Sequence, residues 1–552
     1  MNPLQSLLET QELYPPLPED AGEALARSLD GVAGMHVYPR SIAASRGVVF
    51  FLVRQDRTKW LGLLYRDVSA DVAHFSGQEQ EIELGQPLIL RLCPTDHTNA
   101  AALRRALPFT APQVVGVRKS FGCGDRLGLA TPGHVRSLRK APGIAPVFAQ
   151  QSIREMERSG RTPEQVLDDV TWGVFQEGWR DGFGADADHL KTTADVDVCV
   201  DAGYTMYTVD PGDHVDNEAA TAGLDALKSK VEALPWDVLE SSPQELRAAY
   251  LDRTFDVGDG LVVRFSEETL LRAAAKYSRA VAHSTIMYRH LVATSPPSQA
   301  PSPNVGGGLG WGLESGEGGG GSGVRFELEV SVDETETPTT PEEHFFVASE
   351  LRRLGVRWVS LAPRFIGRFE KGVDYIGDLK QFEVEFTKHV AIARALGPYK
   401  LSVHSGSDKF SVYPVVARLA GDLIHVKTAG TSYLEALRTL ASIDPGLFRE
   451  IFTFARSRYD VDRATYHVSA DLAKVPVPDQ LSDTELIGVL DTFDGREVLH
   501  VTFGSVLTSK NEQGDYCFRQ RLLNALRANE EVYYAALETH IGRHLALFGE
   551  KG

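Results

Sequence analysis

The chain has 552 residues, more than one hydrophobic core usually organises, so we expect one large domain with smaller attachments. Its 57 basic and 75 acidic side chains leave a net charge of −18, and no basic stripe with interleaved aromatic residues is present, which argues against a nucleic-acid partner. The four cysteines have no C-x-x-C spacing, so neither a zinc finger nor a disulfide framework is indicated, and a reducing cytoplasm fits best. The acidic N-terminus is unlike a signal peptide and the run GVVFFLV is too short to cross a bilayer, so we expect no membrane partner.

Residues 1–112 predict a small mixed α/β domain. The helical pattern AGEALARSL is followed by two apolar runs, GVVFFLV and WLGLLY, which the turn-like RQDRTK separates, and then by PLILRL. None of these segments carries a motif for chemistry, so the sequence leaves the purpose of this domain open.

Residues 113–441 change to an alternation of short strands and helices, which is clearest from position 325 onward. RFELEVSV precedes a helix that begins at Thr340 and Pro341, where Glu343 completes a capping box. VRWVSLA, YKLSVHSG and LIHVKTAG are the next three strands, and each is followed by a helical pattern. Four successive βα units of this kind indicate a parallel sheet.

Four weaker strand candidates lie upstream: QVVGVRKSFG, PVFAQQS, FGADADH and TMYTVDPGDHV. Together the eight strands predict an α/β fold with a closed (β/α)8 TIM-like barrel. Residues 294–323 are rich in glycine, proline and serine and cannot supply a core, so we expect a disordered insertion in a barrel loop. Residues 442–552 are mostly helical and are predicted to pack on the barrel as a C-terminal extension.

Polar residues at the strand ends are the first candidates for chemistry, because active sites of such barrels form at the C-terminal ends of the strands. Strand alternation directs His404 toward the barrel axis at the end of its strand, and it places His425 and Lys427 together on the inner face of the next one. His189 ends the third strand, within GADADH.

Three inward histidines on separate strands predict a divalent metal site formed by His189, His404 and His425. Buried imidazoles carry a desolvation cost unless a metal or hydrogen bonds compensate for it. Imidazole is the usual ligand of zinc, which is our first expectation, and three such ligands also accept manganese, cobalt or nickel. The alternative is that each histidine is an ordinary hydrogen-bonded core residue.

Asp188 and Glu329 are the candidate acid and base. Asp188 precedes His189 and can carry a proton to or from a substrate held on the metal, but only if the strand ends or bulges there, because consecutive strand residues point to opposite faces. The alternative for Asp188 is a helix N-cap. Glu329 points inward and is either a fourth ligand or the complementary acid/base, the alternative being a salt bridge to Arg325 or Lys400.

Four residues are candidates for substrate binding. Asp125 and Arg126 lie in the glycine-rich stretch SFGCGDRLGLATPGH, where backbone can approach a ligand and a guanidinium can grip a carboxylate, although a plain turn explains the stretch equally. Lys427 and Lys409 are candidate anion clamps, against the alternative of surface lysines, and Lys427 is preferred because its strand position points it inward.

Several segments in chain order resemble the tagaturonate epimerase family. They are SFGCGDRLGLATPGHVRSL, FAQQSIRE, GVFQEGW, GADADH, DPGDHV, EVSVDETETPT, SVHSGSDKFSVYP, HVKTAGTSYLEA and YHVSADLAKVP. The resemblance runs from about Ser120 to about Ser505 and does not cover the first hundred or so residues.

Members of that family interconvert D-tagaturonate and D-fructuronate, two sugar acids of hexuronate metabolism, by inverting C4 with a divalent metal. Carried over onto the matching segments, the resemblance implies metal binding by His189, His404 and His425, with Asp188 and Glu329 as the acid/base pair.

The chemistry of this reaction favours a retro-aldol route. The C4 hydrogen is not α to the C2 ketone, so enolisation cannot invert that centre, whereas a metal near the ketone and C3 oxygens could stabilise the anion left when the C3–C4 bond breaks and re-forms. The substrate carboxylate is expected on Lys427, Lys409 or Arg126, in that order.

Other functions fit the same residues. A metal-dependent aldolase of the class II type or a 4-epimerase of neutral ketoses could use the same site, and a non-catalytic sugar-acid binding protein is the alternative from another class. A metal-free glycosidase using Glu327 and Glu329 is disfavoured, because both lie on one strand rather than on facing ones. The sequence leaves the oligomeric state open.

Overall fold

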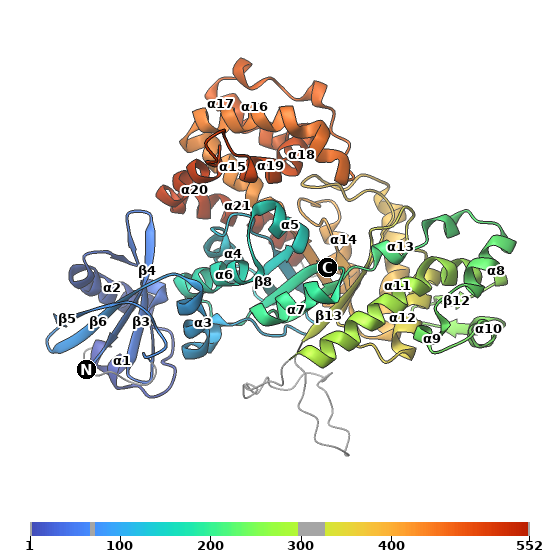
Figure 1. Ribbon diagram of the computed structural model, residues 1–552, viewed down its shortest axis with the longest axis horizontal. Coiled ribbons are helices and arrows are strands. Elements are labelled where there is room, and N and C mark those ends of the chain that lie inside the picture. The colour runs from blue at the N-terminus through green and yellow to red at the C-terminus, as the bar shows by residue number, and fades with distance from the viewer. Residues whose placement is uncertain (1–2, 67–71, 296–325, 550–552) are drawn as a thin grey trace.

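The computed structural model describes residues 3–66, 72–295 and 326–549. At its centre eight parallel strands close into a barrel in the order β10-β13-β14-β15-β16-β7-β8-β9 (Figure 1). Each overlaps one of the predicted segments, which confirms the α/β fold class and the TIM-like barrel. The strands are β7 (Ser120–Cys123), β8 (Ala145–Ser152), β9 (Gly184–Leu190), β10 (Met206–Val209), β13 (Glu327–Val332), β14 (Ser360–Pro363), β15 (Lys400–Val403) and β16 (Ile424–Thr428).

Helices connect the barrel strands and cover the outside of the barrel. The predicted capping box is present at the start of α12, where Thr340 Oγ1 accepts from the Glu343 N–H and the Glu343 carboxylate accepts from the Thr340 N–H. The helices are α4 (Thr131–Arg139), α5 (Ile153–Ser159), α6 (Pro163–Glu177), α7 (Thr193–Ala202), α11 (Glu267–Thr294), α12 (Pro341–Arg353), α13 (Leu379–Leu396), α14 (Tyr413–Ala420) and α15 (Thr431–Ile443).

A subdomain that the sequence analysis did not predict separates β10 from α11. It projects on the side of the barrel opposite the N-terminal sheet (Figure 1). The subdomain contains α8 (Leu224–Glu232), α9 (Trp236–Leu239), α10 (Pro243–Tyr250) and the antiparallel pair β11 (Thr254–Asp256) and β12 (Val262–Arg264). The predicted disordered insertion begins at the last residue of α11, and its positions 296–323 lie outside the described residues.

An antiparallel N-terminal sheet lies beside the barrel, in the order β1-β3-β4-β6-β5 with β2 paired to β3. Alternate side chains of β3 enter two apolar clusters, and the cluster with Phe50 and Leu52 also contains Trp172 and Phe175 of α6, so this face attaches the sheet to the barrel. The elements are α1 (Pro3–Glu9), α2 (Glu19–Ala33), β1 (His36–Val37), β2 (Ala43–Ser45), β3 (Val48–Gln55), β4 (Thr58–Tyr65), β5 (Gln78–Glu83), β6 (Pro87–Pro94) and α3 (His97–Ala106).

The C-terminal part is helical, as predicted, and its last helix joins two cores. In α21, Leu545 and Phe548 belong to the barrel core, while Leu537 belongs to the core of the C-terminal helices. The approach of α21 to α4 requires a glycine, because a Cβ at Gly133 would lie 2.8 Å from Leu537 Cβ. The helices are α16 (Pro445–Asp462), α17 (Asp483–Gly488), α18 (Phe493–Val501), α19 (Phe503–Thr508), α20 (Arg519–Ala528) and α21 (Glu530–Gly549).

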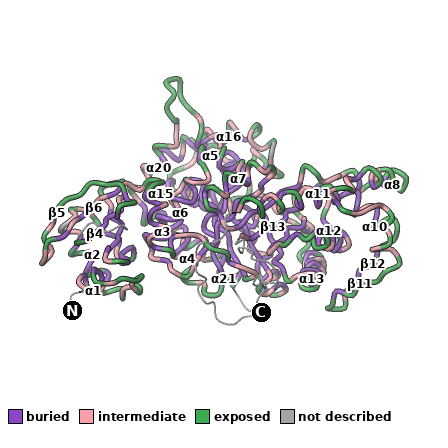
Figure 2. Tube along the Cα trace, turned by 60° about the horizontal axis from the view of Figure 1, so that its bottom comes forward, coloured by how far each residue is buried: buried purple, intermediate pink, exposed green. Residues whose placement is uncertain are grey.

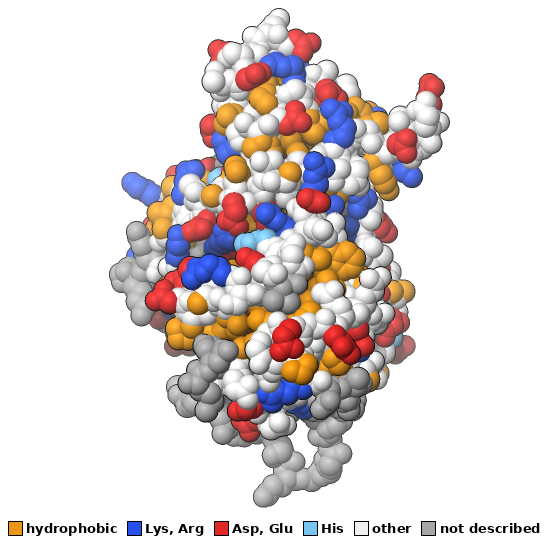
Figure 3. All heavy atoms as spheres, turned by 90° about the vertical axis from the view of Figure 1, so that its left-hand side faces the viewer, with side chains coloured by type: hydrophobic (Ala, Val, Ile, Leu, Met, Phe, Trp, Pro, Cys, Tyr) orange, Lys and Arg blue, Asp and Glu red, His pale blue; other side chains and the backbone are white. Residues whose placement is uncertain are grey.

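Burial is deepest at the barrel, whose strands form the purple centre of Figure 2. On the face shown in Figure 3 acidic and basic side chains are interspersed rather than sorted by sign. Within the part of the chain that the structure describes, no helix has the length and apolar character that a membrane crossing needs.

Candidate active site at the barrel mouth

The inside of this barrel is polar, whereas the interiors of TIM barrels are usually filled with branched apolar side chains. At the amino-terminal end of the strands, Glu327 accepts a hydrogen bond from the Gly116 N–H and Lys400 donates to Ser120 Oγ at 3.1 Å. Buried charges of this kind require partners. The buried polar side chains on the barrel strands are Ser120, Gln150, Gln151, Ser152, Asp186, Asp188, Thr208, Glu327, Glu329, Ser331, Ser360, Lys400, Ser402, His425, Lys427 and Thr428.

Lys427 stands among three carboxylates near the carboxyl ends of the strands. Its Nζ lies 2.7 Å from Asp186 Oδ2, 2.7 Å from Asp188 Oδ1 and 2.8 Å from Glu329 Oε1, and it donates to Thr208 Oγ1 at 2.6 Å. Burial lowers the pKa of Lys427, but the three carboxylates together raise it well above its usual value. The predicted acid/base pair, Asp188 and Glu329, therefore flanks one fixed ammonium.

Glu329 also bonds to His404, which follows β15 directly. Glu329 Oε1 lies 2.7 Å from His404 Nε2, and the other ring nitrogen, Nδ1, lies 3.3 Å from Asp333 Oδ1. Burial lowers the pKa of His404, but the attraction of Asp333 outweighs it and raises the pKa to about 9. Burial raises the pKa of Glu329, yet Lys427 and His404 hold it well below its usual range.

His189 sits on a bulge, which meets the condition that the sequence set for the Asp188 and His189 pair. Between two register points β9 advances three residues while β10 advances two, and His189 has a φ of 52°. His189 Nε2 lies 3.9 Å from Asp188 Oδ1, Nδ1 lies 3.4 Å from Asp210 Oδ2, and the ring centre lies 5.0 Å from that of His404. Burial lowers the pKa of His189, but Asp188 and Asp210 raise it to about 10.

His425 is the deepest of the three predicted ligands. Its Nδ1 lies 2.9 Å from Ser120 Oγ, and its Nε2 has no hydrogen-bond partner among the described residues. Burial, reinforced by the charge of Lys400, lowers its pKa to about 3, so the ring is neutral.

Two groups of metal-ligating side chains within the described residues have ligand atoms that all lie within 4.8 Å of one another. The first contains His189, while His404 and His425 belong to neither group. The groups are His189 with Asp210 and Glu334, and Asp408 with His540 and His544.

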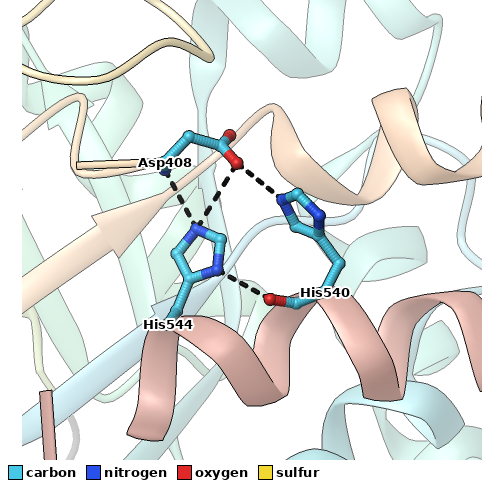
Figure 4. A group of neighbouring side chains, drawn as sticks. All are labelled: Asp408, His540 and His544. Carbon is cyan, nitrogen blue, oxygen red and sulfur yellow. Dashed lines mark hydrogen bonds and ion pairs between the residues drawn. The ribbon is translucent and has the colours of Figure 1, made fainter. Parts of the chain in front are cut away.

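The second group, which we call the C-terminal triad (Asp408, His540 and His544), is buried and could hold a metal ion (Figure 4). Its atoms are already paired. His540 Nε2 lies 2.6 Å from Asp408 Oδ1, and Arg496 Nη2 lies 2.7 Å from Asp408 Oδ2. His544 Nε2 accepts from the Asp408 N–H at 2.9 Å, and its Nδ1 lies 2.9 Å from the His540 carbonyl oxygen. A metal would have to displace these bonds.

The triad holds the loop that follows His404 in a bent shape. Ser405 and Asp408 both have left-handed backbone, with φ of 50° and 62°. Such conformations persist where surrounding contacts over-determine them. Helix α21 therefore supports the loop that carries one of the predicted metal ligands.

A small cavity opens at the barrel mouth. Of the predicted site residues it is lined by Asp188, His189, His404, Lys427 and Arg126. Glu329 lies beneath it, fully buried.

The other predicted substrate ligands are occupied by the protein itself. Asp125 accepts hydrogen bonds from three backbone N–H groups of residues 127–130, and Lys409 Nζ donates to three backbone carbonyls. Arg126 donates twice to Glu155 Oε1, at 3.1 and 2.6 Å, and its guanidinium lies 3.7 Å from the ring centre of Phe503. Arg126 reaches the cavity wall, but its charge is already paired.

Sequence reasoning missed most of the lining residues, six of which carry a charged side chain, an imidazole or an aromatic ring. Four of the six belong to FAQQSIRE, EVSVDETETPT and YHVSADLAKVP, segments that carry the family resemblance, and those segments could have pointed to them. No pattern marks Lys371 and His500. The six are Arg154, Glu155, Glu334, Lys371, Tyr466 and His500.

Known proteins similar to this chain cover nearly all of it. A family model described as tagaturonate epimerase matches residues 38–299 and 321–548, so the likeness takes in most of the N-terminal sheet, which the resemblance seen in the sequence left out. The tagaturonate/fructuronate epimerase of Thermotoga maritima is 42% identical over 514 residues, which are 93% of this chain and 97% of that protein.

Solved structures agree with this match. The fructuronate-tagaturonate epimerase of Cohnella laeviribosi, crystallised with one glycerol, superposes with a TM-score of 0.83 at 39% identity, over 96% of this chain and 100% of that chain. Its native crystal structure gives 0.82 at 39% identity, over 95% and 99%. Sequence and fold together show that the chain belongs to the tagaturonate epimerase family.

Proposed function

We propose that the protein is an isomerase that interconverts D-tagaturonate and D-fructuronate by inversion at C4, with a divalent metal at the barrel mouth. Relatives 39–42% identical over nearly the whole chain are named for these two sugar acids. The observation that carries the proposal is the placement of two buried carboxylates, Asp188 and Glu329, on either side of Lys427 Nζ and beside two histidines.

The residues at the mouth fit a divalent cation. His425 Nε2 and Glu329 Oε2 are buried without a hydrogen-bond partner among the described residues, so each can still give a lone pair to a metal. His189 and His404 carry two positive charges that neighbouring carboxylates stabilise. Imidazole loses its proton when it binds a metal, so those carboxylates would then stabilise the two charges of the cation.

His189, His404 and His425 would hold the metal, with Glu329 as an adjacent carboxylate. When bound, the cation would supply positive charge beside the ketone and C3 oxygens, which stabilises negative charge developing there; zinc is the first expectation and manganese, cobalt and nickel are alternatives.

The protein's own part is proton transfer around C4. Asp188 lines the cavity. Burial raises the pKa of Asp188, but His189 and Lys427 outweigh this effect and hold the pKa below its usual value. Its carboxylate is therefore ionised and can take the C4 hydroxyl proton. Glu329 is the complementary group. The proton that Asp188 takes can pass through the Lys427 ammonium, which contacts both carboxylates, to Glu329, and Glu329 returns it to the C4 oxygen after the C3–C4 bond has broken and re-formed. Between turnovers Lys427 holds both carboxylates in place and keeps them ionised.

The test is an assay of the purified protein on D-fructuronate, followed by nuclear magnetic resonance, paired with metal analysis before and after chelation. We expect both uronates to reach equilibrium, chelation to abolish turnover, and the added metal to restore it. Turnover that survives complete metal loss overturns the metal part. A metal-loaded protein that leaves D-fructuronate unchanged overturns the function.

The same assay separates the alternatives. An aldolase releases three-carbon fragments that accumulate when trapped, and a neutral ketose 4-epimerase converts D-fructose faster than D-fructuronate. A binding protein shows affinity without turnover.

A further inference from the structure

The basic side chains of the cavity differ in whether the protein already pairs them. Arg126 is bonded to Glu155, and Lys427 to three carboxylates. Lys371 and Arg154 line the same cavity, and neither forms an ion pair with any residue that the structure describes. These two cations are therefore available to a negatively charged ligand.

Lys371 lies in the loop between β14 and α13 and points into the cavity. Its Nζ donates to Ser405 Oγ at 2.7 Å, a neutral partner for a charged group. Burial lowers the pKa of Lys371, and Glu155 and Glu334 offset this only in part. A desolvated ammonium with a neutral partner gains from a bound anion.

Arg154 is an exposed residue of α5 on the rim of this cavity. Its guanidinium lies 5.6 Å from the ring centre of Tyr466, which also lines the cavity. A guanidinium beside an aromatic face keeps its N–H groups free for a carboxylate.

The two cations share the cavity with the predicted catalytic residues. Ser405, the partner of Lys371, is the residue after His404, and His404 and Asp188 line the same cavity. In a hexuronate the carboxylate is C6, two carbons beyond the C4 centre that Asp188 would serve.

We propose that Lys371, assisted by Arg154, binds the C6 carboxylate of the substrate and sets the preference for hexuronates over neutral ketoses. The inference rests on the proposed function. Lys371 and Arg154 take the place of Lys427, Lys409 and Arg126 as the expected carboxylate ligands, because the N–H groups of those three residues already bond to the protein. A neutral ketose has a hydroxymethyl group at C6 and leaves the Lys371 charge without a counter-charge.

The experiment compares wild type with Lys371→Met, which keeps the chain length and apolar stem but removes the charge. We expect kcat/KM for D-fructuronate to fall about 10- to 100-fold, mainly through KM, because a hydrogen bond between charged groups is lost. Turnover of D-fructose should change less than threefold. Lys371→Arg should recover part of the loss, Arg154→Met should show a smaller one, and Lys380→Met, at an exposed site on α13, is the matched control.

Binding measured by calorimetry in an Asp188→Asn background gives the same comparison without turnover, and it serves if the wild type does not convert D-fructose. There Lys371→Met should weaken D-fructuronate about 10- to 100-fold and leave D-fructose unchanged. Unchanged uronate affinity, or equal losses for the acid and the neutral sugar, overturns the inference. A wild type that converts neither uronate contradicts the proposed function instead, so the two failures are distinguishable.

Discussion

Two buried clusters of acids and histidines stand about the same barrel and differ in how their atoms are satisfied. In the C-terminal triad both nitrogens of His544 are bonded to backbone groups, and both oxygens of Asp408 are paired. Beneath the cavity at the barrel mouth, His425 Nε2 and Glu329 Oε2 lack partners among the described residues. Proximity of ligand types alone would favour the triad, or His189 with Asp210 and Glu334, over His404 and His425 as a metal site.

The difference teaches that unpaired buried atoms identify a ligand site better than spacing does. A paired cluster has already recovered the free energy that desolvation cost it, so a ligand must break bonds to enter. An unpaired cluster gains when a ligand arrives. We therefore propose that the triad supports the loop after β15 and that the chemistry takes place at the barrel mouth.

The largest expected effect tests the mouth. Asp188→Asn should lower kcat on D-fructuronate about 10²- to 10⁴-fold, because a positioned acid/base group is lost. The free energy of unfolding should change little, since Lys427 keeps Asp186 and Glu329 as partners. Steady-state kinetics and urea titration measure the two quantities. The exposed Asp213→Asn is the control, and a kcat unchanged in Asp188→Asn would remove Asp188 from the mechanism.

The next effect tests the triad. Asp408→Asn keeps the size of the side chain and tolerates left-handed backbone, but it leaves the buried Arg496 guanidinium without the counter-charge of Asp408, so we expect a loss of about 3 kcal/mol in the free energy of unfolding. Metal content should stay at the wild-type level, whereas His404→Ala should lose metal and keep its stability. The opposite pattern, metal lost with Asp408, would make the triad the metal site.

The pH dependence of that loss follows from the sign of the shift. Burial raises the pKa of Asp408, but Arg496 and His540 lower it far below its usual value. The stabilisation is therefore fully present above the unfolded pKa of about 4 and fades as the pH falls toward the folded pKa. Wild type and Asp408→Asn should converge in acid.

The smallest effect concerns a buried pair of acids. This pair lies between the C-terminal triad and the barrel mouth in how its atoms are satisfied, because its two carboxylates compete for the same donor. Glu370 and Glu497 both accept from the Ser469 N–H, at 2.9 and 3.1 Å. Burial, and then Glu370, raise the pKa of Glu497 to about 8. Its contribution to stability is fully present below the unfolded pKa near 4.5 and is lost as the pH rises through 8.

Glu497→Gln should thus raise the free energy of unfolding at pH 9 by about 1–2 kcal/mol relative to wild type and leave it unchanged at pH 5. Chemical denaturation at the two pH values measures it. Equal effects at both pH values would contradict the raised pKa of Glu497.

The sequence predicted the barrel well, because parallel strands read as short apolar runs bounded by caps such as that at Thr340. It did not predict the subdomain between β10 and α11, whose short helices and strands have no repeated alternation. The inner-face positions of Lys427 and Glu329 followed from strand periodicity alone.

The identity of the partners did not follow, because it depends on contacts between strands far apart in sequence. Lys427 was expected to hold the substrate, and the three carboxylates around its ammonium could not be predicted, since alternation gives the direction of a side chain but not its neighbours. Lys371 was invisible because it lies in a loop without a periodic pattern, where only the folded chain shows that its charge is unpaired.

Helix α21 also sets the order in which the protein can mature. The residues that fix Asp408 lie 132 and 136 positions later in the chain, so the ribosome makes them long after β15. A nascent chain with every barrel strand already synthesised would still lack the bonds that shape the loop beside His404, and competence for catalysis would follow rather than accompany closure of the barrel.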